Sequence, residues 1–525
     1  MTVLAATAAA AAGLVLAPGD ALASSGARIT QGVDVTKFDV TPARAYSAPF
    51  VLVDPHNPLN IVEATVEMRS QVCRVFRSTD GGLKWQVMDN LPAPPTYPLC
   101  FNPSGSVTET PLAWGRNDTL YLAMDGWAPQ DGGNTSGNLS IIVSKSTNFG
   151  RTWSAVVARN NRGKTGTSIE TDRPISGIAV DSSGKQDVVY VTYRHNQPGL
   201  PTRAYVIVSK DGGDTWGTPV DIAAPFINTP GNIADLPTAN YVPNDATGFN
   251  PEVQVDNKGN AYVMWEQRTS GVTPAPNYAY YITKSSNEGA TWTTVPAYPS
   301  TPELAGGQFI WSPYGGPQGT LAAVWHGEPG ETQGNTDIYF RSSTDGGQTW
   351  SNPVRLNDDN PADLNIHLLP AIAVAPNGRL DVAWWDFRND TGVFANDVYY
   401  TYSTNDGATW AANIRITDKS INRTFGPWGN GFDMRQPVGL GSTNNFVVFG
   451  YDDTVNGNAQ NQNQDIYSSV YQFHPVPASG PSGVTYVLAA VIGVGAVGLI
   501  LLVVGRTRRR GPEEPVSTPP TPVSA

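Results

Sequence analysis

The stretch RSSTDGGQTW, residues 341–350, decides the fold, because near-copies of it recur along the chain. The other copies are STDGGLKW (78–85), STNFGRTW (146–153), SKDGGDTW (209–216), SSNEGATW (285–292) and STNDGATW (403–410). The shared Asp or Asn can accept hydrogen bonds from the backbone N–H groups that follow it, and Gly supplies the positive φ of a tight turn. The Trp that ends each copy is large and mostly apolar, so it packs the turn against neighbouring structure. The repeat therefore predicts a reinforced β-hairpin turn with a structural role.

The spacing of these turns predicts a ring of similar modules. The tryptophans that end the six copies lie 58 to 76 residues from one copy to the next. Two β-like runs precede each copy, which we call a box, such as PEVQVD (251–256) and AYVMWEQ (261–267), and a short strand follows it. Four strands per period, repeated radially, are the pattern of a β-propeller, in which stacked neighbours supply the core.

The two ends of this repeat array bear on the number of blades. Residues 436–473 supply three more strands without a box, and RITQGVDVTKFDV (28–40) could supply the fourth and close the ring. Closure would remove the exposed edge that an open array leaves. We expect an all-β propeller with seven four-stranded blades; six is the alternative if the last segment is only a cap.

Composition agrees with short strands and many turns. The chain has 525 residues with 53 Gly, 43 Pro and 15% charged residues, a mixture that disfavours long helices. Net charge is −12, and basic residues cluster only in one tail motif, so we expect no nucleic-acid partner.

Both ends of the chain suggest export and membrane anchoring. Residues 1–23 hold an apolar stretch followed by Ala21-Leu22-Ala23, a small-x-small cleavage site, and predict a signal peptide. Residues 484–505 carry no charge and predict a transmembrane helix, with RTRRR (506–510) directly after it on the cytoplasmic side. We therefore expect an extracellular propeller at 24–473, a Pro/Gly linker at 474–483 and a short cytoplasmic tail at 506–525, in a single-pass protein of the cell membrane.

The cysteines and histidines suggest a disulfide and no metal centre. Cys73 and Cys100 are an even pair in a chain expected to be exported, which predicts a disulfide; two free buried thiols are the alternative. Two Cys and five scattered His form no ligand cluster, so we expect no metal site or cofactor. The segment DDTVNGNAQNQNQD (452–465) has oxygen ligands that could hold Ca²⁺, although a solvated loop is the simpler interpretation.

The six turns resemble the Asp boxes, or BNR repeats, of the sialidase (neuraminidase) superfamily, over roughly residues 45–475. The resemblance implies a structural role for the Asp or Asn of each box: Asp80, Asn148, Asp211, Asn287, Asp345 and Asn405. It does not by itself imply sialidase activity, because the same boxes occur in propellers that only bind. Sialidases also have six blades, whereas this sequence predicts seven.

The resemblance does not extend to a catalytic set. Sialidases bind the substrate carboxylate with three arginines and use a Tyr nucleophile activated by Glu, with an Asp acid/base. Their first arginine lies in an R-I-P motif opening the first blade, where this chain has SAPFVLVDP (47–55) without arginine. Tyr193, Tyr399 and Tyr451 are nucleophile candidates by residue type alone, so the catalytic residues stay unassigned.

Polar residues gather where the second strands end, on the face opposite the boxes. Arginine forks there could bind an anionic sugar, while the alternative is that Arg–carboxylate pairs tie neighbouring blades together. The predicted ligand-binding residues are Glu67, Arg69, Arg173, Arg194, Glu266, Arg268, Asp386, Arg388, Trp428 and Arg435. We expect a membrane-anchored extracellular propeller that recognises glycans, and the sequence leaves open whether it hydrolyses terminal, sialic-acid-like bonds as an exo-acting glycoside hydrolase. The alternative is a non-catalytic adhesion or scaffold propeller of the cell envelope.

Overall fold

The structure is a computed structural model of the chain, and it places one part of it in detail. The described residues are 28–38, 44–87, 97, 99–100, 110–127, 138–168, 170–173, 177–198, 200, 202–224, 247–269, 277–302, 308–312, 320–327, 335–390, 392, 394–426 and 437–473. They all belong to one compact unit, which spans Met1–Pro475.

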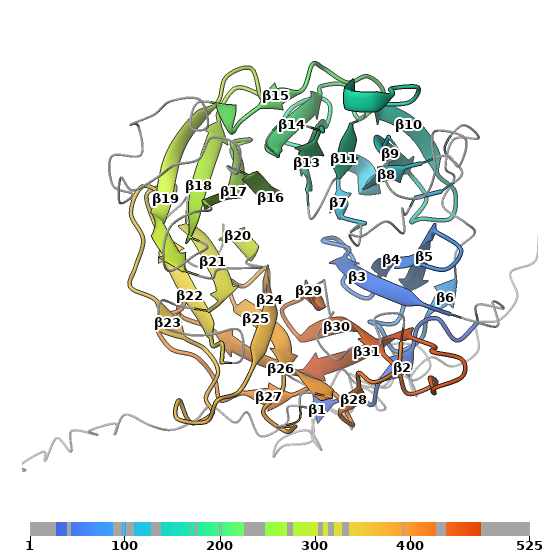
Figure 1. The fold of residues 1–525 in the computed structure, drawn as a ribbon, viewed down its shortest axis with the longest axis vertical. Helices are drawn as coiled ribbons and strands as arrows, with labels where there is room; N and C mark the ends of the chain where they lie inside the picture. The colour runs from blue at the N-terminus through green and yellow to red at the C-terminus, as the bar shows by residue number, and fades with distance from the viewer. Residues whose placement is uncertain are drawn as a thin grey trace, which may run out of the picture. The chain divides into compact units, whose positions relative to one another are not determined.

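Seven antiparallel sheets stand around a common centre as the blades of a propeller (Figure 1). Blade 1 consists of β3 (Tyr46–Val53), β4 (Ile61–Glu67), β5 (Val72–Ser78) and β6 (Gln86–Val87). Blade 2 consists of β7 (Leu112–Trp114), β8 (Leu120–Gly126), β9 (Ser140–Ser146) and β10 (Ser154–Arg159). Blade 3 consists of β12 (Ile178–Asp181), β13 (Val188–Asn196), β14 (Arg203–Ser209) and β15 (Val220–Asp221), with β11 (Thr171–Arg173) pairing with the far end of β13.

The remaining blades continue the same order. Blade 4 consists of β16 (Thr247–Val255), β17 (Ala261–Thr269), β18 (Asn277–Ser285) and β19 (Thr293–Pro302). Blade 5 consists of β20 (Gln308–Ser312), β21 (Thr320–His326), β22 (Ile338–Ser343) and β23 (Val354–Arg355). Blade 6 consists of β24 (His367–Val374), β25 (Leu380–Asp386), β26 (Ala395–Ser403) and β27 (Ile414–Arg415), with β28 (Ile421–Asn422) also pairing with β26.

Both ends of the propeller sequence build blade 7. It holds β29 (Gly439–Ser442), β30 (Phe446–Asp453) and β31 (Asp465–Gln472) from the end of the propeller sequence. Its outer edge is supplied by β1 (Arg28–Ile29) and β2 (Val33–Asp34), which pair antiparallel with β31. The predictions of seven blades and of ring closure by the segment beginning at residue 28 are confirmed.

The Asp boxes form the turn that the sequence predicts, with the same bonds each time. In all six, the Ser hydroxyl oxygen accepts from the Gly N–H at 2.8–3.0 Å. The Asp or Asn Oδ1 accepts from the N–H four residues later at 2.9–3.0 Å. In five boxes the Trp indole N–H donates back to the Gly carbonyl. These bonds within the box close each turn.

The box glycines also explain how each turn fastens two blades together. A Cβ on Gly407 of blade 6 would lie 2.2 Å from the Phe340 ring of blade 5, and one on Gly289 of blade 4 would lie 2.8 Å from Val208 of blade 3. Both glycines also have positive φ, +84° and +75°, which side chains rarely adopt. Glycine is therefore required twice over, by the turn and by close approach to the preceding blade.

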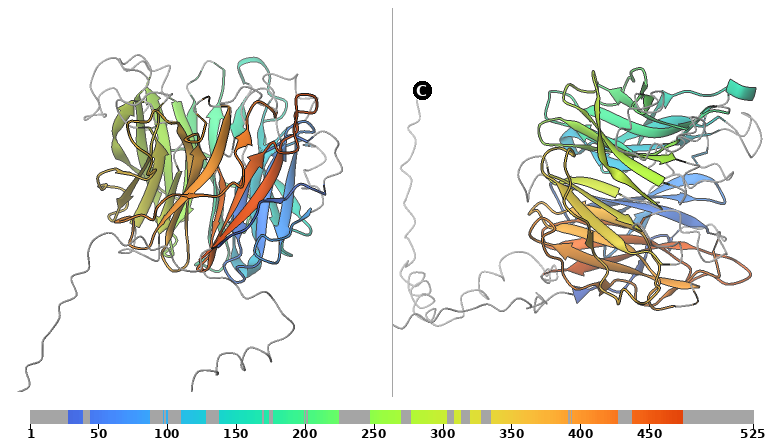
Figure 2. Two further views of the ribbon diagram at one scale, coloured as in Figure 1. Left: turned by 90° about the horizontal axis from the view of Figure 1, so that it is seen from below. Right: turned by 60° about the vertical axis from the view of Figure 1, so that its left-hand side comes forward.

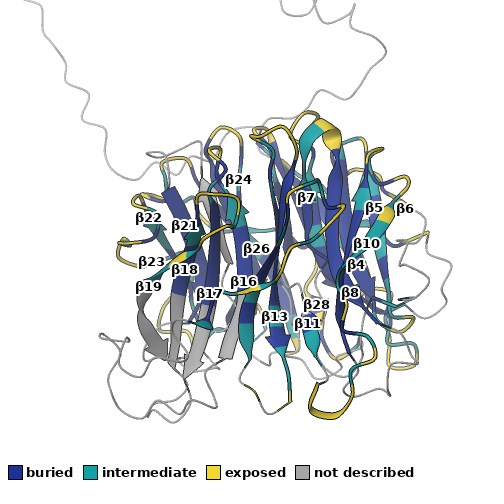
Figure 3. Cartoon of the chain, turned by 90° about the horizontal axis from the view of Figure 1, so that it is seen from above, coloured by how far each residue is buried: buried dark blue, intermediate teal, exposed yellow. Residues whose placement is uncertain are grey.

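The core lies between blades. In the described residues the buried apolar side chains form seven clusters, and each fills the seam between two neighbouring blades. The strands are buried along most of their length, while hairpins at their ends are exposed (Figure 3). Since one four-stranded sheet buries too little alone, stacking around the ring supplies the stability.

The disulfide prediction is confirmed, whereas the segments predicted at the two ends of the chain are outside the described residues. Cys73 at the start of β5 is bonded to Cys100 of the connection to blade 2, with Cα atoms 5.8 Å apart. Among the residues that the structure describes, no helix is long and apolar enough to cross a membrane. The signal peptide (1–23), linker (474–483), transmembrane helix (484–505) and tail (506–525) predicted above lie outside the described residues.

Candidate functional site

The antiparallel strands give the propeller two distinct faces, which the side views of Figure 2 show. The box face carries the six Asp boxes, which connect third to fourth strands, together with the hairpins between first and second strands; for example, Gly81 of the first box donates to Leu59 of the β3–β4 hairpin. The loop face is formed by the ends of the second strands and the connections between blades. The two faces therefore place the boxes away from the predicted ligand-binding residues.

A cavity of about 450 Å³ runs along the centre of the ring. It is lined by the innermost strands of six blades, and most of its wall is aliphatic. Phe50 and Trp114 add aromatic surface, and Glu252 and Gln254 of β16 add polar groups. A pocket of this size, lined by apolar side chains together with some polar groups, has the general character of a small-molecule binding site.

At the loop face, the second strands of several blades carry a polar residue at one equivalent position of the ladder, here called the polar rung. The residue opposite it lies on the first strand or, in blade 3, on β11. The paired residues are Tyr46 with Glu67, Asp172 with His195, Phe249 with Glu266, and His367 with Asp386. The second-strand residue is an acid or a histidine in each case. This shared rung explains why the ends of the second strands look alike in the sequence.

In blade 1 the rung residue and the predicted arginine both bind the chain itself. Glu67 is fully buried, and its carboxylate accepts from the N–H groups of Ala45 and Ser70 and from the Ser70 hydroxyl. Arg69 donates to the carbonyl oxygens of Asn461 and Gln462 in the β30–β31 connection, at 2.9 and 2.7 Å. These bonds join blade 1 to blade 7 across the loop face.

Between blades 2 and 3 the rung joins a buried acid to a histidine. Asp172 is fully buried, and its carboxylate lies 2.6 Å from His195 Nδ1. Arg159 donates to it at 3.2 Å and Asn161 at 2.6 Å, and Arg159 also pairs with Glu170 at 2.7 Å. The carboxylate fixes the orientation of the imidazole, as an acid partner does for a histidine in many sites.

Between blades 5 and 6 the same rung is built with the acid and the imidazole exchanged. His367 is 1% exposed, and its Nε2 lies 3.4 Å from Asp359 and 3.5 Å from Asp386. Its Nδ1 lies 2.6 Å from the carbonyl oxygen of Thr336 in blade 5. Burial alone would lower the pKa of His367, but the bond and charge of Asp359 and the charge of Asp386 raise that pKa above its usual value.

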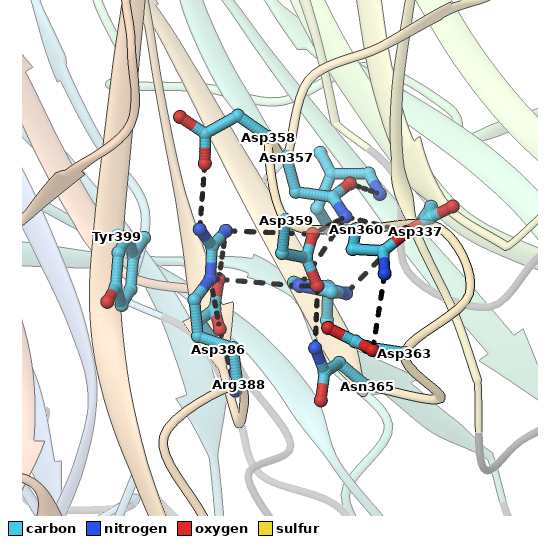
Figure 4. Close-up of polar contacts among 12 residues, drawn as sticks. Asp337, Asn357, Asp358, Asp359, Asn360, Asp363, Asn365, Asp386, Arg388 and Tyr399 are labelled. Atoms are coloured by element: carbon cyan, nitrogen blue, oxygen red, sulfur yellow. Dashed lines mark hydrogen bonds and ion pairs between the residues drawn. The ribbon is translucent and has the colours of Figure 1, made fainter.

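Arg388 shares Asp386 with this histidine and lies in a dense polar network (Figure 4). Its guanidinium pairs with Asp386 and Asp358, each at 2.8 Å, and donates to Asn413 at 3.0 Å. It also stacks over the Tyr399 ring, 4.2 Å from the centroid. Burial would lower the pKa of Arg388, yet Asp386 and Asp358 raise it, so the arginine stays charged while it ties the blade 5–6 connection to blade 6.

The other predicted ligand-binding residues are located less fully. Arg173 and Arg194 are Cα partners in the β11–β13 ladder, and Glu266 and Arg268 lie at the end of β17. Trp428 and Arg435 lie outside the described residues. Binding of a ligand by any of these ten residues stays a prediction.

The three tyrosine candidates differ in access. Tyr193 and Tyr451 are 0% and 2% exposed, so a substrate would not reach their hydroxyls in this arrangement. Burial, with Asp172 nearby, also raises the pKa of Tyr193 well above its usual value, which opposes a nucleophilic role. Tyr399 is partly exposed, and its hydroxyl accepts from Asn389 at 3.1 Å.

Sequence reasoning missed Arg159, Glu170, His195, Asp359 and His367 as members of these networks. All but His195 lie in or next to connections between blades, where no repeated motif marks them. The signal that could have drawn attention to two of them is the scarcity of histidine, since the chain has only five. Two of those five occupy the same rung of different blades.

Three groups of acids and histidines in the described residues bring their ligand atoms close together. They are Asp54–His56–Asp118, Glu170–Asp172–His195 and Asp337–Asp359–His367. In the last two groups the carboxylates already form ion pairs with arginines: Arg159 pairs with Glu170, and Arg355 pairs with Asp337 and Asp359. None of the groups draws on residues 452–465, the segment considered for Ca²⁺.

Comparison with known proteins finds similarity in structure. No family model matches the sequence, and no curated protein matches it. A protein of unknown function from Dyadobacter fermentans is 15% identical, covers 85% of this chain and 99% of its own, and has a TM-score of 0.45. The alpha-L-arabinanase of Penicillium chrysogenum, complexed with arabinobiose, is 15% identical over 73% of this chain and 99% of its own, with a TM-score of 0.44. The sialidase of Trypanosoma rangeli is 12% identical over 74% of this chain and 56% of its own, with a TM-score of 0.42.

The assignment of the fold rests on the chain's own blades and boxes. Seven four-stranded antiparallel sheets surround one axis, and six of them carry an Asp box between the third and fourth strands. This chain therefore has the sialidase-like β-propeller fold that its Asp boxes predict.

Proposed function

We propose that this chain is a glycan-recognising propeller at the cell surface, anchored in the membrane by residues 484–505, and that its ligand enters the central cavity from the loop face. The observation that supports this is the cavity of about 450 Å³ with its few polar groups. A sugar ring offers apolar faces as well as hydroxyls, so Phe50 and Trp114 suit its faces and Glu252 and Gln254 suit its hydroxyls.

Hydrolysis of a terminal glycosidic bond is the more specific part of this proposal. Most glycosidases use two carboxyl groups that flank the scissile bond. Glu252 is the acidic residue among those that line the cavity in the described part of the chain, and it is 9% exposed. It is the group that we would assign as general acid, with its partner to come from the loop face.

A panel of fluorogenic glycosides and a glycan array test the two parts separately. We expect the full-length chain to bind at least one glycan class, and Gln254→Leu to weaken that binding by removing a polar group from the cavity wall. Glu252→Gln should keep binding but abolish turnover. Asp345→Asn on the box face is the matched control and should change neither. Absence of binding to every glycan would overturn the proposal, and binding without turnover would restrict it to recognition.

One observation favours a second function, that of a non-catalytic adhesion or scaffold module. Arg69 and Arg388 are both predicted to bind ligand. In the structure they instead donate hydrogen bonds to, and form ion pairs with, neighbouring blades and connections. A protein partner recovered by crosslinking, together with a glycan array that shows no binding, would favour this function.

A further inference from the structure

The seam between blades 7 and 1, where the ring closes, is built by unusually close backbone contact. Val51 of blade 1 packs onto three glycines of blade 7. A Cβ on Gly439, Gly441 or Gly450 would lie 2.9 Å from a methyl carbon of Val51, closer than real Cβ contacts. At these points the Val51 side chain lies directly against the glycine backbone of blade 7. Val51, Gly439 and Gly441 also line the central cavity, so this seam is part of its wall.

A carboxyl group is buried inside this tight seam. Glu63 lies in the middle of β4 and is 0% exposed. Neither of its carboxyl oxygens has a hydrogen-bond partner among the described residues. A Cβ on Gly450 would lie 2.4 Å from Glu63 Oε1, so the carboxyl occupies the space that this glycine leaves free. An ionised carboxylate without partners is one of the costliest groups to bury.

The charges around Glu63 do not favour its ionised form. From blade 7, Asp452 faces it across the seam and raises its pKa, in addition to the larger effect of burial. Asp453 follows on the same strand, and burial raises the pKa of both aspartates to about 6. Three other charged groups in or next to the two packed blades have partners of their own.

Arg423, before blade 7, donates to Asn396 and to the backbone of Asp452. Arg44, before β3, pairs with Asp465 of β31 at 3.0 Å. Glu67, at the end of Glu63's own strand, is bonded to Ala45 and Ser70. No cation of the described residues pairs with Glu63.

We propose that Glu63 is a proton-operated latch on ring closure: the seam between blades 7 and 1 packs with the Glu63 carboxyl protonated, and loss of that proton separates the two blades and opens the wall of the central cavity. This inference goes beyond the proposed glycan recognition and does not depend on it. It explains why an acid stands in the middle of an apolar strand and why glycine stands opposite.

The direction of the pH effect follows from the raised pKa of Glu63 in the closed ring. In an open seam, Glu63 would ionise near the ordinary glutamate pKa of about 4.3. Between that value and the pKa in the closed ring, closure takes up one proton, so the ratio of closed to open seam falls about tenfold for each unit of rising pH. Asp452 and Asp453 contribute only up to their pKa of about 6, so among these three carboxyl groups only Glu63 can account for a further decline that is confined to this seam above that pH.

Two measurements on the full-length chain test the latch. Difference infrared spectroscopy should show the C=O band of a protonated carboxyl at pH 7, and Glu63→Gln should remove it. Hydrogen exchange from pH 5 to 9, corrected for the intrinsic rate, should show β3, β4, β29 and β30 losing protection as pH rises, while β13 and β14 in blade 3 keep theirs. Glu63→Gln, which has the same shape and no charge, should flatten that loss, whereas Asp453→Asn should leave the decline above pH 7 unchanged.

The outcomes separate the latch from a merely buried acid. A wild-type chain without the protonated band at pH 7 would show that Glu63 is ionised in the closed ring, and the inference would be wrong even if Glu63→Gln did not fold. The same pH dependence of exchange in wild type and Glu63→Gln would also overturn it. Gly450→Ala should open the seam at every pH, because its Cβ takes the place of the carboxyl; a normal, pH-sensitive seam in that variant would contradict the contact itself.

Discussion

The two faces of this propeller are built on opposite principles. On the box face one turn is repeated six times with the same hydrogen bonds, and its glycine packs on the preceding blade in the same way. On the loop face the blades share one polar rung, but each seam fills it with different partners. The difference teaches that repetition marks the fastening of the ring, while the individual properties of the molecule lie where the repeat breaks down.

Two seams of the loop face sharpen this contrast. Asp172–His195 and His367–Asp386 stand at the same rung, with the acid and the imidazole exchanged between the second strand and the strand paired with it. The His195 side chain is 10% exposed, whereas that of His367 is 1% exposed and lies between two aspartates. The first imidazole has one aspartate partner and keeps some exposure, whereas the second is enclosed between Asp359 and Asp386, which raise its pKa.

The largest effect should come from the box face. Trp85 of the first box is 5% exposed and packs in the cluster of the closing seam, so Trp85→Ala should lower the free energy of unfolding by about 3–5 kcal/mol. Trp350→Ala, at a partly exposed box tryptophan, should cost less. Chemical denaturation measures both, and glycan binding by the folded fraction should be unchanged. A loss of binding without a loss of stability would break the comparison, because it would place ligand binding on the box face.

Arg388→Met should show that the loop face also holds blades together. The substitution leaves the fully buried Asp386 without its closest cation, and since removing one partner of a buried pair is strongly destabilising, we expect a loss of about 2–4 kcal/mol. Arg151→Met, at an exposed arginine of the box face, is the control and should change stability by less than about 0.5 kcal/mol. Normal stability combined with lost glycan binding would instead make Arg388 a ligand-binding residue, as the sequence first suggested.

The next effect in size should be the change in the free energy of unfolding caused by His367→Gln, followed over a series of pH values. Because the folded pKa of His367 is raised, its charged form contributes stability fully below the unfolded pKa of about 6.5, and that contribution is lost as pH rises through the folded pKa. The stability difference between wild type and His367→Gln should therefore be largest near pH 6 and narrow toward pH 9, as followed by urea denaturation. His195→Gln, at the exchanged rung, is the comparison variant. A difference that does not change with pH would mean that folding leaves the pKa of His367 unchanged, and a difference that grows as pH rises would mean that His367 is neutral in the folded chain.

The repeated features of this fold could be read from the sequence, and the features that cross seams could not. The boxes, the four-strand period, the closing N-terminal strand and the Cys73–Cys100 bond depend on local spacing or on one obvious pair. By contrast, Asp358 reaches Arg388 from the connection between blades. The sequence gives no sign of the contact between Glu63 and Gly450, because the two residues lie in different blades and are far apart in the chain. Contacts of that kind follow from how blades stack, and no motif records them.

The smallest effect should come from Asp345→Asn, and it is informative because it is small. In its box, Thr349 donates to both carboxylate oxygens of Asp345, from its N–H at 2.9 Å and from its hydroxyl at 2.6 Å. The equivalent Asn287 accepts the same N–H at 3.0 Å and donates its own amide to the Thr291 hydroxyl at 2.8 Å. Asparagine therefore closes the turn as well as aspartate does, so unfolding at pH 7 should change by less than about 0.5 kcal/mol. Asp345→Ala removes the side chain that closes the turn and should cost about 1 kcal/mol.

A turn closed by aspartate and a turn closed by asparagine should respond differently to acid pH. Although burial opposes it, the bonds from Thr349 and Ser343 lower the pKa of Asp345 to about 2. The contribution of the Asp345 carboxylate to stability is present above the unfolded pKa of about 3.9 and is lost as pH falls through the folded pKa. An asparagine at the same position does not titrate. Asp345→Asn should thus gain relative to wild type as pH falls below 4, measured by denaturation at matched ionic strength. If the variant were strongly destabilised at pH 7 instead, the charge of Asp345 would matter beyond closing a turn, and the box face could no longer be treated as fastening alone.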